Sequence, residues 1–280
     1  MTEVTRFAPS PSGRLHLGHA YAALFAREAA GKNGRFLLRI EDIDGTRCRS
    51  ELEQGLYEDL AWLGLDWERP VLRQSERGRA YQDALERLKK LGVLYPCFCT
   101  RREIAAEIAR AGQAPHGPEG ALYPGTCRVS AAISPAQNNC GPASAWRLDV
   151  EKARKIGGKL TWHDEFRGTV EAQPEKLGDV VLARRDIATS YHLAVTLDDA
   201  AQGVSLVTRG ADLFEATHIH RLLQALLELP VPRWKHHELL KDSAGKRLAK
   251  RDRARSIAAL REAGWTPQQV RVEAGIGASL

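Results

Sequence analysis

Two histidines stand three residues apart where the chain turns from an expected strand into an expected helix. Residues 9–19 read Pro-Ser-Pro-Ser-Gly-Arg-Leu-His-Leu-Gly-His. Ser, Pro and Gly favour a tight turn, and Gly18 lets the backbone approach a ligand closely. A helix N-terminus binds anions, and the imidazoles of His16 and His19 could donate to charge that develops on a phosphate. The segment therefore indicates a phosphate site.

A second segment carries positive charge. Residues 241–253 read Lys-Asp-Ser-Ala-Gly-Lys-Arg-Leu-Ala-Lys-Arg-Asp-Arg. Lysine supplies the point charge that a polyphosphate needs. By itself such a run more often marks a solvated basic surface or an RNA contact.

Carboxylates and guanidiniums supply the remaining polar candidates. Glu41 follows the strand expected at 35–40, where open α/β sheets bind ligands, and could receive a substrate ammonium group. Tyr191 could bind a substrate carboxylate or amine, and Arg209 could bind a carboxylate through two N–H groups. Arg6 adds a second guanidinium, so a diacid is favoured over its amide.

Three of the five cysteines form a candidate zinc site. Cys97 and Cys99 are separated by one residue, and Cys127 follows across a Pro/Gly-rich stretch. Three thiolates and one further ligand make a closed tetrahedral zinc site, and metal would stabilise a segment with little core. The candidate fourth ligands are Tyr123, His116 and Cys140, and intrinsic chemistry favours His or Cys. An odd number of cysteines argues against a disulfide framework.

The hydrophobic pattern indicates the elements that position these residues. Strand patterns occur at 4–8, 35–40, 93–96, 145–148, 177–182, 191–197 and 203–208, and helix patterns at 19–30, 50–64, 76–91 and 216–228. The strand–helix–strand order at the start predicts a parallel α/β sheet. We expect four regions: a first half of a nucleotide-binding core at 1–92, an insertion at 93–145, a second half at 146–240, and a basic loop with a short helical tail at 241–280.

Composition limits the classes of protein. The 280 residues are 43% hydrophobic and 27% charged, which is typical of globular proteins. No apolar run is long enough to span a membrane, and we see no signal peptide, so we expect a cytoplasmic protein. A net charge of +6 permits a polyanionic partner without requiring one.

Four of these motifs, in order, resemble class I aminoacyl-tRNA synthetases of the glutamyl branch. Residues 16–19 resemble the family's His-Ile-Gly-His signature, and residues 6–13, Arg-Phe-Ala-Pro-Ser-Pro-Ser-Gly, resemble its glutamyl form. The stretches at 39–47 and 186–212 resemble the family's glutamate-binding segments. Residues 247–251, Arg-Leu-Ala-Lys-Arg, stand where the family has Lys-Met-Ser-Lys-Ser and retain only Lys250 outright.

The resemblance implies a Rossmann-like doubly wound parallel sheet with a small zinc-binding insertion. It implies catalytic roles for His16, His19 and Lys250, and ATP binding by these residues with Gly18, accompanied by Mg²⁺. It implies L-glutamate binding by Arg6, Ser10, Glu41, Tyr191 and Arg209. For zinc it favours Tyr123 as the fourth ligand beside Cys97, Cys99 and Cys127.

Within this branch the chain is most similar to short members that lack an anticodon-binding domain. We expect no such domain here, because the tail after the basic loop is too short for one. The resemblance implies ATP-dependent activation of L-glutamate and its transfer to queuosine in the anticodon of tRNA(Asp), by a protein that we expect to be monomeric. Two alternatives are a minimal enzyme that charges a tRNA 3′ end and an inactive paralogue that senses glutamate or nucleotide.

Overall fold

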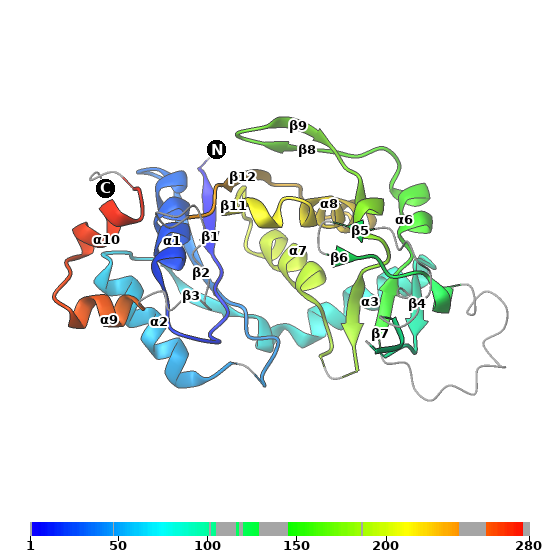
Figure 1. Cartoon of the computed structure of the whole chain (residues 1–280). Helices are drawn as coiled ribbons and strands as arrows, with labels where there is room; N and C mark the ends of the chain where they lie inside the picture. Colours follow the sequence, from blue (N-terminus) through cyan, green and yellow to red (C-terminus); the bar gives the residue numbers. More distant parts are fainter. Residues whose placement is uncertain are drawn as a thin grey trace.

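The structure is a computed structural model that describes residues 2–46, 48–100, 102–104, 116–117, 120–128, 145–185, 187–240 and 256–276. Figure 1 shows an elongated chain with the N-terminal strands towards one end and β4 (Leu94–Cys97) and β7 (Ala145–Leu148) at the other. No helix among these residues is long and apolar enough to cross a membrane.

A parallel sheet forms the first half of the core. Its strands lie in the order β1-β2-β3, and α1 and α2 follow the first two strands. The elements are β1 (Val4–Phe7), α1 (Leu17–Ala30), β2 (Arg35–Ile40), α2 (Ser50–Trp62) and β3 (Glu68–Arg73). Small buried residues of α1, such as Ala20 and Ala23, let this helix lie close to the sheet. The strand–helix–strand order expected at the start of the chain is confirmed.

The second half of the core continues this sheet. The backbone N–H of Ser205 donates to the carbonyl of Val4 at 3.0 Å, which places β11 beside β1. β12 pairs in parallel with β11, and β8 pairs with β12 and with β9. The elements are β8 (Thr161–Asp164), β9 (Gly168–Glu171), β11 (Leu206–Gly210) and β12 (Arg233–His237). The strand order β3-β2-β1-β11-β12 is that of a doubly wound α/β fold.

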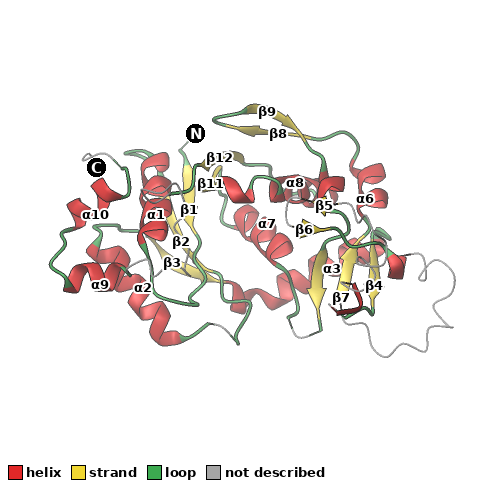
Figure 2. Ribbon diagram, viewed as in Figure 1, coloured by secondary structure: helices red, strands yellow, loops and turns green. Residues whose placement is uncertain are grey.

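A separate antiparallel sheet lies at the far end of the molecule, and Figure 2 shows its strands apart from those of the core. It has the order β10-β7-β4 and packs with α3, α6 and α8 around one apolar cluster. The elements of this part are η1 (Gln74–Arg77), α3 (Gly78–Lys90), β4 (Leu94–Cys97), β7 (Ala145–Leu148), α6 (Val150–Gly157), η2 (Pro174–Leu177), β10 (Val181–Arg184) and α8 (Ala216–Leu226). Two short strands, β5 (His116–Gly117) and β6 (Gly120–Ala121), form a separate pair, and η3 (Ala211–Leu213) directly follows β11 of the core. The sheet therefore joins strands from both sides of the long excursion between β4 and β7.

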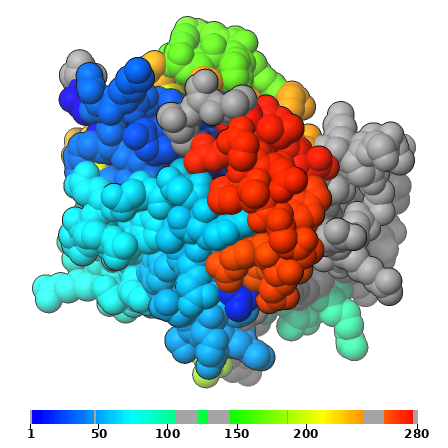
Figure 3. Space-filling view, turned by 90° about the vertical axis from the view of Figure 1, so that its left-hand side faces the viewer, coloured from blue at the N-terminus to red at the C-terminus, as the bar shows by residue number. Residues whose placement is uncertain are grey.

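The tail folds back onto the first half of the core. Its helices are α9 (Ile257–Glu262) and α10 (Pro267–Glu273). The Ile257 N–H donates to the Leu15 carbonyl at 2.8 Å, and the Arg271 guanidinium donates to the Leu63 carbonyl at 2.8 Å. Figure 3 shows these helices, in orange and red, against the blue segment that includes α2. The expected helical tail is confirmed.

One expected strand is wrong. Residues 191–197 belong to α7 (Tyr191–Ala201), a helix. The Ser190 hydroxyl accepts from the Leu193 N–H at 3.4 Å and caps this helix. A short apolar run fits a buried strand and a buried helix equally well, and here the cap at Ser190 was the missed signal. The strand expected at 177–182 likewise begins only at Val181, because η2 takes residues 174–177.

Asp198 joins α3 and its preceding turn to α7. Its side chain is fully buried and accepts from Gln74 at 2.9 Å, Arg77 at 2.6 Å and Tyr81 at 2.8 Å. Removing one partner of a buried charged network leaves the other groups unsatisfied, which costs several kcal/mol.

We expect Asp198→Ala to lower the free energy of unfolding by about 3 kcal/mol, because two buried donors and one cation lose their acceptor. Urea denaturation followed by circular dichroism measures this change. Asp83→Ala is the control, since the Asp83 side chain on α3 is 72% exposed. Its effect should stay below about 1 kcal/mol. Equal effects of the two substitutions would contradict the assigned role of Asp198.

Candidate active site

His16 and His19 cap the N-terminus of α1 together. The Nδ1 of His16 accepts from the Gly18 N–H at 3.1 Å, and the Nδ1 of His19 accepts from the His16 N–H at 3.2 Å. The two ring centroids are 3.8 Å apart. Because both Nδ1 atoms accept, the neutral rings carry their proton on Nε2 and can donate from there. A Cβ at Gly18 would lie 3.0 Å from His16 Cε1, so glycine keeps this cap close.

A pocket of about 380 Å³ adjoins this helix end, at the carboxyl ends of β1 and β2. Ser10, His19 and Glu41 line it, with Phe7, Ala8, Pro9, Ser12, Ile43, Asp44 and Cys48. Burial raises the pKa of Glu41, and the charges of Arg39 and Arg6 oppose this rise. The pocket thus combines a carboxylate with the helix end that carries the two histidines.

Arg6 is held by a buried carboxylate. Its Nε donates to Asp199 Oδ1 at 2.8 Å, and its Nη1 donates to the Thr208 carbonyl at 3.0 Å. The Nη1 of Arg39 donates to the same Asp199 oxygen at 2.7 Å, and its Nη2 donates to Glu41 at 3.2 Å. Burial alone would raise the pKa of Asp199, but Arg6 and Arg39 outweigh it and hold the pKa below its ordinary value. The charge of Arg6 is therefore already paired.

Arg209 is held differently. Its Nε donates to His236 Nε2 at 3.1 Å, and its Nη2 donates to the Thr217 hydroxyl. Its Nη1 donates to the Tyr191 hydroxyl at 3.3 Å and lies 3.2 Å from His220 Nδ1. Within the described residues, no carboxylate contacts this guanidinium. Arg209 is 6% exposed, and no anion among the described residues contacts its charge.

The structure thus places the candidates in three neighbouring groups. Ser10, Glu41 and His19 share the pocket, Tyr191 contacts Arg209, and Arg6 binds the carbonyl of Thr208, the residue before Arg209. Lys250 lies outside the described residues, so its role remains a prediction.

Sequence reasoning missed most partners of the two guanidiniums. Asp199, Arg39, Thr217, His220 and His236 were not among the candidate site residues, although their side chains are all buried. The available signal was polar residues within otherwise apolar segments: Thr217 and His220 lie on α8, whose residues 216–220 are all buried. Such residues need partners, because an unpaired buried polar group is costly.

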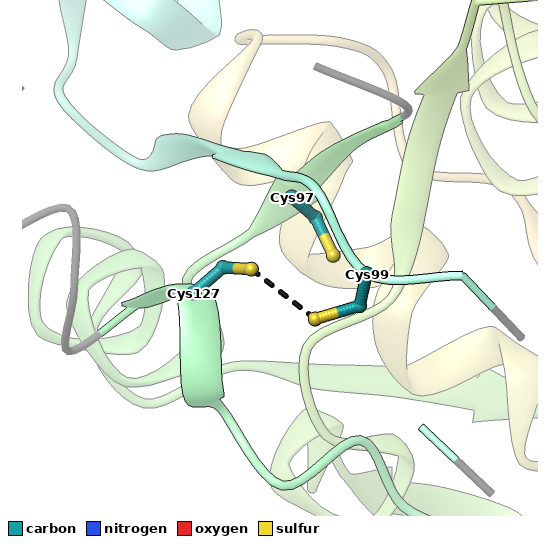
Figure 4. Close-up of side chains that lie close together, drawn as sticks. All are labelled: Cys97, Cys99 and Cys127. Carbon is teal, nitrogen blue, oxygen red and sulfur yellow. Dashed lines mark hydrogen bonds between the residues drawn. The ribbon is translucent and has the colours of Figure 1, made fainter. Parts of the chain in front are cut away.

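The three cysteines meet at the end of β4. Figure 4 shows Cys97, Cys99 and Cys127 turned toward one another. Their sulfur atoms lie within 4.8 Å of each other, and those of Cys99 and Cys127 are 3.3 Å apart. Zn–S bonds of about 2.3 Å in a tetrahedron place sulfur atoms about 3.8 Å apart, so small shifts would accommodate zinc. Burial raises the pKa of Cys99 to about 12, so a thiolate there needs a stabilising cation.

Tyr123 supplies an oxygen beside the sulfur atoms. Its hydroxyl lies 3.6 Å from the sulfur of Cys97 and 3.6 Å from that of Cys99, and it accepts from the Cys127 N–H at 2.9 Å. Cys140 and the side chain of His116 lie outside the described part of the chain. The cluster therefore offers three sulfurs and one phenol oxygen that could hold a metal ion.

Comparison with known proteins defines the class to which this fold and site belong. Residues 3–273 match the catalytic domain of class I tRNA synthetases for glutamate and glutamine. A crystal structure of a glutamate tRNA ligase from Elizabethkingia meningosepticum superposes with a TM-score of 0.75 and 25% identity. The match covers 98% of this chain and 60% of that one.

The chain belongs to this class I glutamyl and glutaminyl tRNA synthetase family. Its curated relatives include proteins named glutamyl-Q tRNA(Asp) synthetase. The one from Rhodobacter capsulatus is 53% identical over 275 residues, which cover 96% of this chain and 98% of the relative. The one from Nocardia farcinica is 46% identical over 268 residues, which cover 95% and 81%.

We expect Asp199→Asn to lower the free energy of unfolding at pH 7 by about 3 kcal/mol, because two buried guanidiniums lose their shared anion. A folded pKa below the unfolded value makes the carboxylate stabilising above the unfolded pKa, near 4. That stabilisation is lost as pH falls through the folded pKa.

The difference between the Asp199→Asn variant and the original protein should therefore shrink below about pH 4. Urea denaturation at pH 7, 5 and 3 measures it. A difference that stays constant from pH 7 to pH 3 would contradict an ionised Asp199 in the folded state.

Proposed function

We propose that the chain activates L-glutamate with ATP and transfers it to queuosine in the anticodon of tRNA(Asp). The observation that carries the first part is the buried Arg209 guanidinium, which no carboxylate among the described residues contacts. It lies on β11, which packs against α1, the helix capped by the two histidines. The queuosine acceptor is supported by the names of the relatives alone.

In the first step an oxygen of the glutamate α-carboxylate attacks the α-phosphorus of ATP, and pyrophosphate leaves. His16 and His19 donate from Nε2 to the phosphate oxygens on which charge develops. Lys250 stabilises the departing pyrophosphate, and Mg²⁺ accompanies ATP. Positioning and charge neutralisation carry most of this step, as in phosphoryl transfer generally.

Glutamate is recognised by opposite charges. Glu41 receives the ammonium group, and Ser10 lies in the same pocket. Arg209 and Tyr191 bind a carboxylate of glutamate. Arg6 contributes less attraction for a carboxylate, because Asp199 already balances its charge. Glutamine would leave the Arg209 cation buried beside a neutral amide, which costs more than a lost contact between neutral groups.

In the second step a hydroxyl of the queuosine cyclopentene ring attacks the activated carbonyl. The acyl–phosphate bond breaks, the glutamyl ester forms and AMP leaves with the carboxyl oxygen. The hydroxyl proton can pass to the adenylate phosphate, which leaves as AMP.

We expect radiolabelled glutamate and ATP to label tRNA from normal bacteria and not tRNA from bacteria unable to make queuosine. The nucleophilic hydroxyl on the cyclopentene ring is absent from the second pool. The transfer is measured as acid-precipitable label in each tRNA pool after incubation with the full chain.

His19→Ala is the matched catalytic variant, and His163→Ala on β8 is the control, because His163 is exposed. We expect His19→Ala to reduce pyrophosphate exchange by about a hundredfold or more, since one donor to the phosphate is lost. The lost cap should cost only about 1 kcal/mol of stability. Equal label in both tRNA pools would instead indicate 3′-end charging, and no glutamate-dependent exchange would indicate a sensor.

We also propose that Cys97, Cys99, Tyr123 and Cys127 bind one structural zinc ion. The convergence of three sulfurs and the phenol oxygen supports this set. The ion would join the end of β4 to the segment around Cys127.

We expect purified protein to contain one zinc per chain by plasma emission spectroscopy. Cys97→Ser should lose the metal, because a hydroxyl is a far weaker ligand than a thiolate. Cys48→Ser should keep it, because Cys48 lines the pocket near His19 and not the cysteine cluster. Metal-free native protein, or retention of zinc by Cys97→Ser, would contradict the site.

A further inference from the structure

Arg209 is surrounded by imidazoles from three different elements. Arg209 lies on β11, His236 lies opposite it on β12, and His220 lies on α8. His192, on α7, contacts His220 through a 3.2 Å nitrogen–nitrogen contact. His220 is 3% exposed and His236 is 4% exposed, so their hydrogen bonds must be satisfied by protein groups.

The contacts determine which imidazole nitrogen carries the proton. Because Arg209 can only donate, His236 Nε2 and His220 Nδ1 must accept. The proton of His236 is then on Nδ1, which lies 2.7 Å from Asp164 Oδ2. The proton of His220 is on Nε2 and is directed to His192 Nδ1. All three rings are therefore neutral.

Electrostatics agrees with this assignment. Burial and the charge of Arg209 lower the pKa of His192 to about 4, and burial, Arg209 and His192 lower that of His220 well below its ordinary value. Burial and Arg209 lower the pKa of His236 to about 3, although Asp164 opposes the change. A second cation 3 Å from Arg209 would be strongly unfavourable.

Arg6 and Arg209 thus differ in whether a carboxylate contacts the guanidinium. A carboxylate of Asp199 holds Arg6 and balances its charge, whereas neutral acceptors orient Arg209 without balancing it. The carboxylate of Asp164 is separated from Arg209 by the full width of the His236 ring. No anion in the described part of the chain contacts Arg209, so a substrate carboxylate can pair with its charge.

We propose that His220 and His236 are positioning residues that determine specificity for an anionic substrate side chain by holding Arg209 with neutral acceptors. This inference rests on the proposed binding of glutamate at Arg209. A carboxylate at either position would hold the guanidinium equally well and would neutralise it in advance. The preference of the site for a ligand with a carboxylate side chain over one with a neutral amide side chain would then be smaller.

The test compares two substitutions at one position. His220→Glu places a carboxylate beside Arg209, and His220→Gln places a neutral acceptor of similar reach there. Isothermal titration calorimetry on the full chain measures the Kd of L-glutamate and of L-glutamine. His163→Glu adds the same charge at an exposed position on β8 and serves as the control.

We expect His220→Glu to raise the Kd of glutamate at least about tenfold while the Kd of glutamine changes little, because the new carboxylate neutralises the Arg209 charge that attracts only the anionic ligand. His220→Gln should change the ratio of the two Kd values far less. A folded His220→Glu protein that weakens both ligands by the same factor would show a merely structural role and overturn the proposal.

His236 provides a second test if His220→Glu does not fold. His236→Gln keeps an acceptor near the Nε2 position, and His236→Asn keeps only a partner for Asp164. We expect His236→Asn to weaken glutamate binding more than His236→Gln does, and the reverse order would overturn the proposal. Pyrophosphate exchange by the unsubstituted protein is measured separately. Glutamate binding without exchange would reject the proposed reaction but not the role of the two histidines. Binding of neither amino acid would overturn both the proposed reaction and the role of the histidines.

Discussion

The buried carboxylate of Asp199 is the interaction on which the arrangement of the site depends. It joins α7 to β1 through Arg6 and to β2 through Arg39. Three elements from both halves of the chain therefore meet at one anion. A buried anion shared by two cations is stable only when all three are correctly placed, so this contact also positions Glu41, which Arg39 holds from the same guanidinium.

The arginines of this region have two different roles. Arg6 and Arg39 connect the halves of the core and have paired charges, whereas Arg209 is oriented by Tyr191, Thr217, His220 and His236. Neutral acceptors satisfy the N–H groups of a guanidinium at little electrostatic gain, so the cation retains a strong preference for an anion. A binding site for a charged ligand needs such a group, and among the described residues no carboxylate contacts it.

The cysteine cluster lies away from the charged site and has a different proposed role, which is structural. The sequence between β4 and β7 is rich in Gly and Pro, and the sulfur atoms of Cys97, Cys99 and Cys127 converge at the end of β4. A metal there would connect Cys97 and Cys99 at the end of β4 to Cys127, which lies within that sequence. The proposed metal site would thus tie Cys127 to the end of β4, because metal binding can contribute directly to the stability of a fold.

The sequence by itself determined the order of the first strands and helices, the His16–His19 turn at a helix start and the pairing of Cys97 with Cys99, because local propensity and short spacing encode these features. It also identified Arg6 and Arg209, but as equivalent guanidiniums. Only the tertiary structure decided that Asp199 pairs with Arg6 and that imidazoles hold Arg209, since these contacts join residues more than a hundred positions apart or on different elements. It also decided that residues 191–197 are helical, because a short apolar run acquires its conformation from its cap and from the surfaces that bury it.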